Sequence, residues 1–280
     1  MATTKIGIIG LGLMGGSLSI ALQETSDSFY IIGLDHNEKH SSQALELGLV
    51  NEVVLTLEEI SHCDIIILTI PVNGIIAVSK QFKDLDPKCT IIDFGSTKEK
   101  ISDSIPKEIR ANFITAHPMT GTEKFGPAAA ISDLYTDKIV VLCDLEKSGI
   151  HQQNVAKKFF SDIKMQLVLM DAKEHDRHAA FISHMPHAVS YAIANTVMKQ
   201  EEATSIVALA AGGFKDMSRI AKSSPNMWED IFRQNKDNLL EAIDSFQAEL
   251  QKCHKMVENE EWETLNNWMT EANTLHDVLY

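Results

Sequence analysis

Several kinds of segment are missing from this 280-residue sequence. No positively charged and then apolar leader follows Met1, and no apolar run approaches the roughly 18 residues that a membrane-spanning helix needs. Internal repeats and low-complexity stretches are also absent from the sequence. We therefore expect a chain that is neither exported nor embedded in a membrane, with the cytoplasm as its location.

Cysteine and positive charge are scarce. The four cysteines are widely separated, and three of them lie in or beside apolar, strand-like segments, so we expect buried free thiols rather than disulfides or a metal site. The formal net charge is -14. Nucleic acids and anionic membranes require a basic surface, so we expect neither as a partner, whereas a small anionic substrate requires only a few well-placed cations.

Glycine, in contrast, is concentrated in the segment Gly10–Gly16, which follows the apolar run Ile6–Ile9 and opens a stretch with helical periodicity. This order is typical of a dinucleotide-binding turn. Gly10 permits the tight turn, Gly12 lets backbone N–H groups approach a pyrophosphate, and Gly15 allows the helix to pack closely on the strand. The residues expected to contact the cofactor here are Gly10, Gly12, Leu13, Met14 and Gly15.

An acidic residue, Asp35, stands at the end of the next predicted strand, 20 residues after Gly15. A carboxylate at this place accepts hydrogen bonds from the ribose hydroxyls and repels a 2′-phosphate, so it predicts NAD rather than NADP as the cofactor. The alternative is a glycine-rich turn that binds nothing. It is disfavoured because strand, helix and acidic residue all occur in the expected order.

Short apolar runs alternate with helix-like stretches from Lys5 to about Met170. This alternation predicts an α/β fold, a Rossmann-type doubly wound and mostly parallel sheet, with ligands at the carboxyl ends of its strands. We assign residues 1–170 to this dinucleotide-binding domain. The predicted strands are Ile6–Ile9, Tyr30–Leu34, Ile65–Ile70, Thr90–Phe94, Phe113–Ala116, Ile139–Leu142 and Met165–Leu169.

The strand pattern ends near Asp171, and residues 171–280 are expected to form an all-helical domain for substrate binding and dimerisation. Apolar residues between Trp228 and Val257 recur at helical spacing, with one gap of seven, and predict a single long helix that starts at Ser224-Pro225. A second helix is expected from about Glu260 onward. The apolar stripe needs a partner surface, either neighbouring helices or a second copy of the chain, and we favour a homodimer.

Two polar clusters directly follow predicted strands. In the first, Asp93–Lys98, Ser96 either contributes to the ligand site or serves as the N-cap of the following helix. In the second, Ala116–Glu123, His117 is well placed to accept a proton from a substrate hydroxyl as a hydride leaves the same carbon. A half-buried histidine bonded to a turn is the alternative. Glu123 orients His117, touches the substrate or is simply solvated.

A third cluster lies in the helical half. Pro186 either kinks a helix or starts one, and it separates His184 from His187. Further along, a glycine pair precedes Lys215 and Arg219 and allows both side chains to point the same way. Arg219 offers a planar, two-pronged donor for a carboxylate, and Lys215 a second positive charge. Solvated surface cations are the alternative interpretation.

A metal site is not predicted. The histidines at 175, 178, 184 and 187 lack the HExxH pattern and a nearby cysteine. His175 and His178 are interpreted as a solvated helix face.

Five motifs in order along the chain resemble the prephenate and arogenate dehydrogenase family of tyrosine biosynthesis. Four of them lie beyond the glycine turn, which is itself common to many dehydrogenases. The motifs are GLGLMGGS at 10–17, DFGSTK at 93–98, AHPMTGTE at 116–123, SHMPH at 183–187 and GGFKDMSRIA at 212–221.

The resemblance implies a Rossmann-type domain, a helical dimerisation domain and an active site between them. It implies that His117 is the catalytic histidine, that Ser96 bonds this histidine or the substrate hydroxyl, and that Arg219 holds a substrate carboxylate. By the same resemblance, His187 and Lys215 line the substrate pocket. Glu123 matches an acidic position near the site. The role of Glu123 stays open.

The resemblance also implies the reaction, an NAD-linked oxidative decarboxylation. His117 accepts the ring hydroxyl proton of prephenate or arogenate, a hydride passes to NAD, and the ring carboxylate leaves as carbon dioxide. The products are 4-hydroxyphenylpyruvate and tyrosine, respectively. We expect no fused chorismate mutase and no sensing domain, so that any inhibition by tyrosine acts at the active site.

Two other functions are compatible with the glycine turn alone. A β-hydroxyacid-type NAD(P) dehydrogenase shares the glycine opening but carries a helical lysine followed four residues later by asparagine, and the stretch Phe181–His187 lacks that pair. A non-catalytic NAD-sensing protein has no reason to keep His117, Ser96 and Arg219 together.

Overall fold

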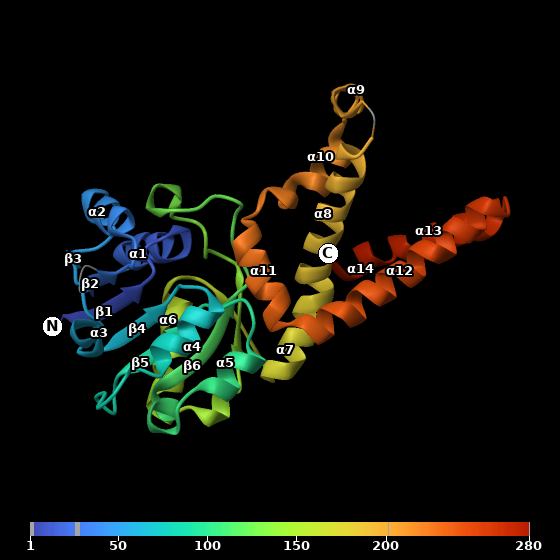
Figure 1. Ribbon diagram of the computed structural model, residues 1–280. Coiled ribbons are helices and arrows are strands. Elements are labelled where there is room, and N and C mark those ends of the chain that lie inside the picture. The colour runs from blue at the N-terminus through green and yellow to red at the C-terminus, as the bar shows by residue number, and fades with distance from the viewer. Residues whose placement is uncertain (1–2, 26–28, 201, 280) are drawn as a thin grey trace. The chain divides into compact units, whose positions relative to one another are not determined.

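The computed structural model describes residues 3–25, 29–200 and 202–279. These residues fall into two compact units, Met1–Asn235 and Lys236–Tyr280. An eight-stranded sheet forms the centre of the first unit (Figure 1). Its strands are β1 (Thr4–Ile9), β2 (Phe29–Leu34), β3 (Glu52–Val53), β4 (Ile65–Leu68), β5 (Thr90–Asp93), β6 (Phe113–Pro118), β7 (Ile139–Cys143) and β8 (Gln166–Met170).

The strand order is β3-β2-β1-β4-β5-β6-β7-β8, and all neighbours are parallel except β6 and β7, which are antiparallel. The chain first moves outward from β1 to β3 and then returns to β4 on the other side of β1. The order therefore reverses between β1 and β4. In open α/β sheets, ligands bind outside the carboxyl ends of the strands at such a reversal.

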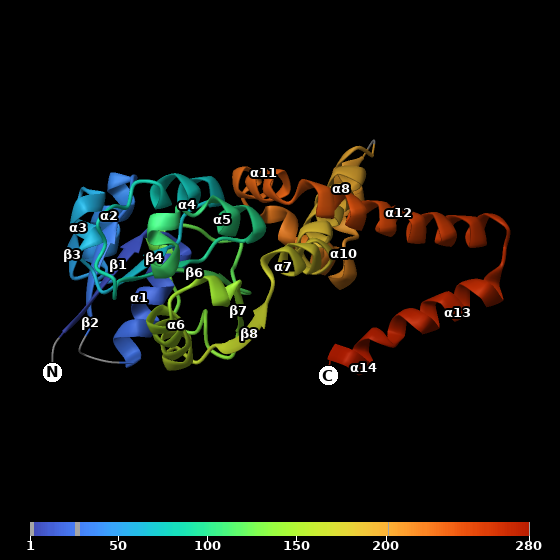
Figure 2. The same cartoon turned by 90° about the horizontal axis from the view of Figure 1, so that it is seen from below.

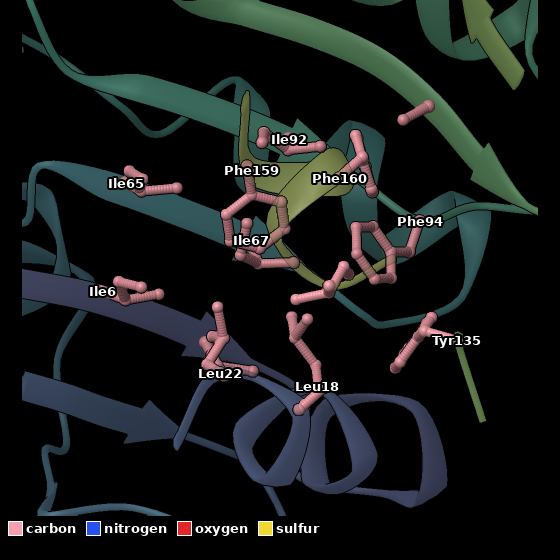
Figure 3. Packing of buried hydrophobic residues seen from close by; sticks show 14 of the residues in the cluster. Ile6, Leu18, Leu22, Ile65, Ile67, Ile92, Phe94, Tyr135, Phe159 and Phe160 are labelled. Atoms are coloured by element: carbon pink, nitrogen blue, oxygen red, sulfur yellow. The ribbon is translucent and has the colours of Figure 1, made fainter. Parts of the chain in front are cut away.

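Successive side chains of a strand point to opposite faces of the sheet, and in β1, β4 and β5 the side chains on both faces are buried. Ile6, Ile8 and Ile67 belong to one apolar cluster, which includes α1 (Leu13–Thr25) and α6 (Ile150–Asp162) and is shown in Figure 3. The opposite face holds a second cluster. It is covered by α3 (Leu57–Ser61), α4 (Val72–Ser79) and α5 (Glu99–Ser104). Figure 2 shows α4 and α5 on one side of the sheet and α1 and α6 on the other.

The seven strands predicted from the sequence are all present, and each differs from the prediction by one or two residues at one end or at both ends. The predicted doubly wound fold is confirmed. The short strand β3 was missed because two residues carry no periodicity. The predicted strand Ile65–Ile70 ends early, at Leu68, where Thr69 turns its hydroxyl to the carbonyl groups of Ile9 and Gly10 at 3.1 and 2.6 Å. The helix α2 (Glu38–Glu46) follows β2.

The helical half begins with α7 (Ala172–Ala179) and α8 (Met185–Met198), which are joined by a π-helical turn at Ala180–His184. Pro186 lies at the start of α8 and has no N–H to donate to the carbonyl group of Ile182. The wide turn forms where this bond is missing, and the N–H of Met185 bonds to the carbonyl oxygen of Ala180.

Three shorter helices complete the first unit: α9 (Ala203–Ala208), α10 (Gly212–Ser218) and α11 (Pro225–Gln234). The prediction of one continuous helix from Ser224 to Val257 was wrong. Helix α11 ends at Asn235, whose side chain bonds to other elements, and α12 (Lys236–Glu258) is a separate helix.

The second unit consists of α12, α13 (Trp262–Asn273) and α14 (Leu275–Leu279). The second helix expected after Glu260 is thus divided at Thr274. Figure 2 shows α12 and α13 meeting at a turn and diverging from it. The indole N–H of Trp268 bonds to the carboxylate of Glu249 at 3.0 Å across the pair. No helix in the described part of the chain is long and apolar enough to cross a membrane.

Candidate active site

The glycine turn after β1 has the geometry that each predicted glycine role requires. Gly10 has a φ of +101°, and an added Cβ would lie 2.6 Å from the carbonyl oxygen of Thr69. A Cβ on Gly15 would lie 2.0 Å from the carbonyl oxygen of Gly10, so α1 packs directly on the turn. A Cβ on Gly12 would meet nothing within 4 Å. The backbone at Gly12 is therefore open to a ligand.

The turn is also suited to an anion. Helix α1 begins at Leu13, and the first N–H groups of any α-helix have no partner within the helix. The first bond closing this turn runs from the N–H of Gly16 to the carbonyl oxygen of Gly12. Leu13 and Met14 thus present backbone N–H groups at the positive end of the helix dipole, beside the open side of Gly12. This arrangement fits a pyrophosphate.

Asp35 lies at the end of β2, and its side chain is 5% exposed. Its carboxylate accepts the N–H of Leu11 and the N–H of Asn37, both at 2.8 Å, and the Nδ1 atom of His40 lies 3.5 Å away. A carboxylate offers about four acceptor positions, so ribose hydroxyls still find acceptors. Asp35 therefore connects the end of β2 to the glycine turn. The bond to Leu11 joins residues 24 positions apart, and no local pattern in the sequence predicts it.

The segment after β5 contains a buried ion pair. The ammonium group of Lys98 bonds to the carboxylate of Asp93 and to the carbonyl oxygen of Ala116 at 2.6 Å, and the side chains of Lys98 and Asp93 are both 0% exposed. The carboxylate of Asp93 also accepts the N–H of Ala116 at 3.1 Å. Both ends of the pair thus hold the backbone directly before His117.

Ser96 is half-buried in this segment, and its hydroxyl forms no side-chain hydrogen bond within the described residues. The structure does not use Ser96 as an N-cap. Helix α5 begins at Glu99 with Lys98 at the cap position, and the backbone N–H groups of these two residues donate to Asp176 at 3.0 and 2.7 Å. The capping carboxylate comes from a different helix, α7, which the sequence alone could not reveal.

His117 is a half-buried residue near the carboxyl end of β6. Its Nδ1 atom lies 2.8 Å from the Nε2 atom of His175. Burial lowers the pKa of His117 well below its usual value, and the nearby side chains of His175, Lys98 and His184 lower it further. The imidazole is therefore neutral at pH 7 and available as a base.

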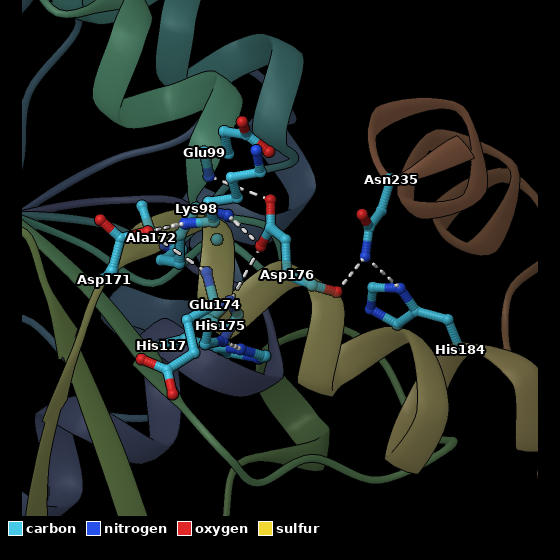
Figure 4. A network of polar contacts seen from close by, with 12 residues as sticks. Lys98, Glu99, His117, Asp171, Ala172, Glu174, His175, Asp176, His184 and Asn235 are labelled. Carbon is cyan, nitrogen blue, oxygen red and sulfur yellow. Dashed lines mark hydrogen bonds and ion pairs between the residues drawn. The ribbon is translucent and has the colours of Figure 1, made fainter. Parts of the chain in front are cut away.

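His175 and Asp176 correct the interpretation of the 175–178 region as a solvated face. His178 is exposed, but His175 and Asp176 are each 2% exposed. The Nδ1 atom of His175 lies 2.8 Å from the Oδ1 atom of Asp176, which extends the contact of His117 into a chain of three side chains (Figure 4). One signal was present in the sequence. The buried residues of α7 and the turn after it follow helical spacing, and they are Ala172, His175, Asp176, Ala179 and Ala180.

His184 is buried on the π-helical turn, and the amide of Asn235 donates to its Nδ1 atom at 3.1 Å and to the carbonyl oxygen of Asp176 at 2.6 Å (Figure 4). Burial lowers the pKa of His184 to about 4. Helix α11 therefore ends on the same network that holds His117.

His187 lies half-buried on α8, with its Nδ1–H donating to the carbonyl oxygen of Ser183 at 2.9 Å. This bond satisfies one of the carbonyl groups beside Pro186. The imidazole stacks on Trp228 with ring centroids 3.5 Å apart, and burial lowers its pKa. The indole N–H of Trp228 is buried without a hydrogen-bond partner in the described residues.

The candidate residues form an electrostatic series rather than isolated positions. The pKa of His117 responds to His184, that of His184 responds to His187, and that of His187 responds to Arg219. Arg219 is exposed. Trp228 contacts both His184 and His187, with ring centroids 6.0 and 3.5 Å apart, and α8 packs against the segment Arg219–Lys222, so the structure brings His184, His187 and Arg219 into one region.

Lys215 and Glu123 are not tied into this region. Lys215 is exposed and Glu123 is half-buried, and no hydrogen bond or ion pair links either to the other candidates among the described residues. Nor do the described residues contain a group of three or more histidine, cysteine or acidic side chains arranged to hold a metal ion.

Comparisons with known proteins cover nearly the whole chain. Residues 18–169 match the family described as prephenate dehydrogenase, nucleotide-binding domain, and residues 171–271 match prephenate dehydrogenase, dimerization domain. The chain is 31% identical over 278 residues to the prephenate dehydrogenase of Bacillus subtilis, covering 97% of this chain and 75% of that protein.

Two solved structures are similar along their whole length. One is the prephenate dehydrogenase of A. aeolicus in complex with hydroxyphenyl propionate and NAD+, with 30% identity, a TM-score of 0.92, and coverage of 100% of this chain and 99% of that chain. The other is the arogenate dehydrogenase of Synechocystis, with 25% identity, a TM-score of 0.80, and coverage of 99% and 100%. Sequence and structure together place this chain in the prephenate dehydrogenase family.

Proposed function

We propose that the protein catalyses the NAD-linked oxidative decarboxylation of prephenate, arogenate or both. The observation that carries the proposal is the state of His117. It is a neutral imidazole at the end of β6, held through Nδ1, with its Nε2 atom free of hydrogen bonds within the described residues. A general base must be unprotonated at the working pH and able to reach its proton.

In the reaction, the Nε2 atom of His117 takes the proton of the ring hydroxyl as its O–H bond breaks. The ring carbon that bears this oxygen loses a hydride, and the C–C bond to the ring carboxylate breaks to release carbon dioxide and leave an aromatic ring. The proton then returns from Nε2 to the ring oxygen, which gives the phenol and regenerates the base. NAD supplies the hydride acceptor when it is bound. Lys98 and Asp93 hold the backbone before His117, and the proposed role of Ser96 is to bond the substrate hydroxyl.

The cofactor is proposed to lie across the carboxyl ends of β1 and β4. Its pyrophosphate would contact the backbone at Gly12, Leu13 and Met14, and its ribose would contact Asp35. The absence of any neighbour within 4 Å of a Cβ at Gly12 supports this placement. The carboxylate of Asp35 disfavours a 2′-phosphate, which supports NAD over NADP.

The helical half is proposed to hold the anionic substrate. Arg219 is assigned to a carboxylate, and the packing of α8 against the segment Arg219–Lys222 together with the planar, two-pronged guanidinium supports this role. His187 and Lys215 are assigned to the pocket lining, and Glu123 to its edge. We keep residues 1–170 and 171–280 as the two functional domains, and the cytoplasm as the expected location.

We also propose a homodimer. Several apolar side chains of α8 and α9 and of the segment after them are exposed, among them Met198 at 65%, Val207 at 44% and Leu209 at 85%. A second copy of the chain covers such a surface at low cost, and the match to a dimerization domain supports this partner. Light scattering at micromolar concentration should give twice the mass of one chain. The mass of a single chain would contradict the proposal.

One assay tests the proposed reaction. NADH formation is followed with prephenate and with arogenate, each in the presence of NAD or NADP. We expect absorbance to rise with at least one substrate and NAD, and carbon dioxide to be released in equal amount. No change with either substrate would overturn the proposal, and a preference for NADP would overturn the role of Asp35.

A further inference from the structure

His175 and Asp176 lie next to the proposed base but do not reach toward the substrate side of the site. We propose that they are positioning residues that determine which nitrogen of His117 carries the proton. The proposal rests on the proposed role of His117 as the general base, and it concerns how that base is kept in its working form.

The carboxylate of Asp176 determines the direction of the chain of bonds. It accepts the backbone N–H groups of Lys98 and Glu99 and lies 2.8 Å from the Nδ1 atom of His175 (Figure 4). A carboxylate that already receives two N–H donors acts as an acceptor. The Nδ1 atom of His175 must therefore carry its proton, because the other tautomer would set a lone pair against the carboxylate oxygen.

This assignment passes from one ring to the next. A neutral His175 with its proton on Nδ1 has a lone pair on Nε2. That lone pair lies 2.8 Å from the Nδ1 atom of His117, which must donate to it. The proton of His117 is thus held on Nδ1, and its Nε2 atom is left with a lone pair. Nε2 is the nitrogen that a substrate hydroxyl can reach.

The same chain of hydrogen bonds lowers the free-energy cost of placing a positive charge on His117. Burial and the nearby ammonium group of Lys98 disfavour a positive charge on this ring. When the substrate proton arrives on Nε2, the Nδ1–H bond to His175 stays in place, and the negative charge of Asp176 lies at the far end of the chain. His175 and Asp176 therefore stabilise the imidazolium of His117 without contacting the substrate, as the aspartate does in a Ser-His-Asp triad.

Asp176 also caps α5, so a purely structural role is the competing explanation. The two roles predict different results. A cap affects stability, whereas a positioning residue affects the tautomer of His117 and the proton-transfer rate. Two substitutions separate them. Asp176→Asn keeps the size of the side chain but offers an N–H to His175, and His175→Phe removes the link while leaving Asp176 on the N–H groups of Lys98 and Glu99.

The controls lie on the same helix. Asp171→Asn alters the N-cap of α7, where the carboxylate accepts the N–H groups of Lys173 and Glu174 at 2.8 and 3.3 Å and contacts no histidine. His178→Gln changes an exposed histidine one turn away from His175. Both controls should retain wild-type turnover.

The first readout is the tautomer of His117, measured by 15N NMR of histidine-labelled protein without substrate. We expect the Nδ1–H form in the wild type, the Nε2–H form in Asp176→Asn, and a mixture in His175→Phe. An Nε2–H form in the wild type would overturn the proposal. This readout does not depend on the reaction, and the turnover of His117→Asn tests the base role separately.

The second readout is turnover as a function of pH. We expect kcat to fall roughly 10²- to 10⁴-fold in Asp176→Asn and at least about 10-fold in His175→Phe, with NAD affinity unchanged in both. The double variant should lose no more than Asp176→Asn alone, because the two residues act as one unit. If Asp176→Asn does not fold, His175→Phe with its tautomer measurement decides. Wild-type kcat in a folded His175→Phe protein would overturn the proposal.

Discussion

The glycine turn at residues 10–16 and the histidine network around His117 are built in opposite ways. The turn consists of backbone groups from one short stretch of chain, and its function depends on atoms that are missing from Gly10, Gly12 and Gly15. The network consists of side chains from β6 and α7, with the backbone N–H groups of Lys98 and Glu99 bonded to Asp176. The glycine turn should lose its function when atoms are added to its glycines. The histidine network should lose its function when functional groups are removed from its side chains.

The largest effect is expected at the network. His117→Asn should lower kcat roughly 10²- to 10⁴-fold, because the base is lost. The dissociation constant for NAD, measured by fluorescence titration, should stay within about twofold, since the turn is untouched. Loss of NAD binding together with turnover would break the comparison, because it would mean that the two regions act as one.

Two glycine substitutions test the glycine turn. Gly15→Ala should destabilise the protein by about 3 kcal/mol, because its Cβ would lie 2.0 Å from the carbonyl oxygen of Gly10. Gly12→Ala is the matched variant. With nothing within 4 Å of its Cβ, it should leave the free energy of unfolding nearly unchanged and weaken NAD binding. Denaturant unfolding and NAD titration of both variants check this, and equal stability losses would contradict it.

The network should also make stability depend on pH. His184 is protonated near pH 6.5 in the unfolded chain and only near pH 4 in the folded protein. Above pH 6.5 it is neutral in both states and the free energy of unfolding is at its full value. As the pH falls from 6.5 toward 4, the unfolded chain gains the proton first, so the free energy of unfolding decreases. The loss should reach roughly 3 kcal/mol at pH 4. The free energy of unfolding, measured between pH 4 and 7, should depend less steeply on pH for His184→Gln than for the wild type. The exposed-site variant His178→Gln is the control and should keep the wild-type slope.

The smallest effect is expected at the exposed cation. Arg219→Gln should raise the KM for the substrate roughly 10-fold, because a charged hydrogen bond to a carboxylate is lost, while kcat changes little. Arg233→Gln, on the exposed face of α11, is the control and should leave both constants unchanged. A large loss of kcat with an unchanged KM would assign Arg219 to the transition state instead.

The two regions also differ in how far the sequence predicts them. The tight turn at Gly10, the close packing at Gly15 and the place of Asp35 directly after a strand could be predicted, because their spacing follows from one strand, one helix and the next strand, all of which are local patterns. His117 could be placed because it ends a buried strand. The break between α11 and α12 could not be predicted, because the gap of seven between Phe232 and Leu239 fits one continuous helix. The break at Asn235 depends on contacts with Asp176 and His184.

His175 shows why the network could not be predicted in full. Its importance arises from a contact with a residue 58 positions earlier, and its partner Asp176 is recognised only by where α5 begins. The buried stripe of α7 placed a histidine and an aspartate among alanines, which is a signal of an inward polar pair. It indicates burial, and it does not indicate the partner.

The π-helical turn at Ala180–His184 lies between α7, which carries His175, and α8, which carries His187. One residue of an α-helix turns the chain by about 100°, so deleting the exposed Ile182 would restore regular winding and rotate α8 relative to α7 by about that angle. His187 would leave Trp228, whereas His175 would keep its place against His117. A single insertion or deletion here would therefore change the surroundings of His187 and leave the contacts among His117, His175 and Asp176 in place.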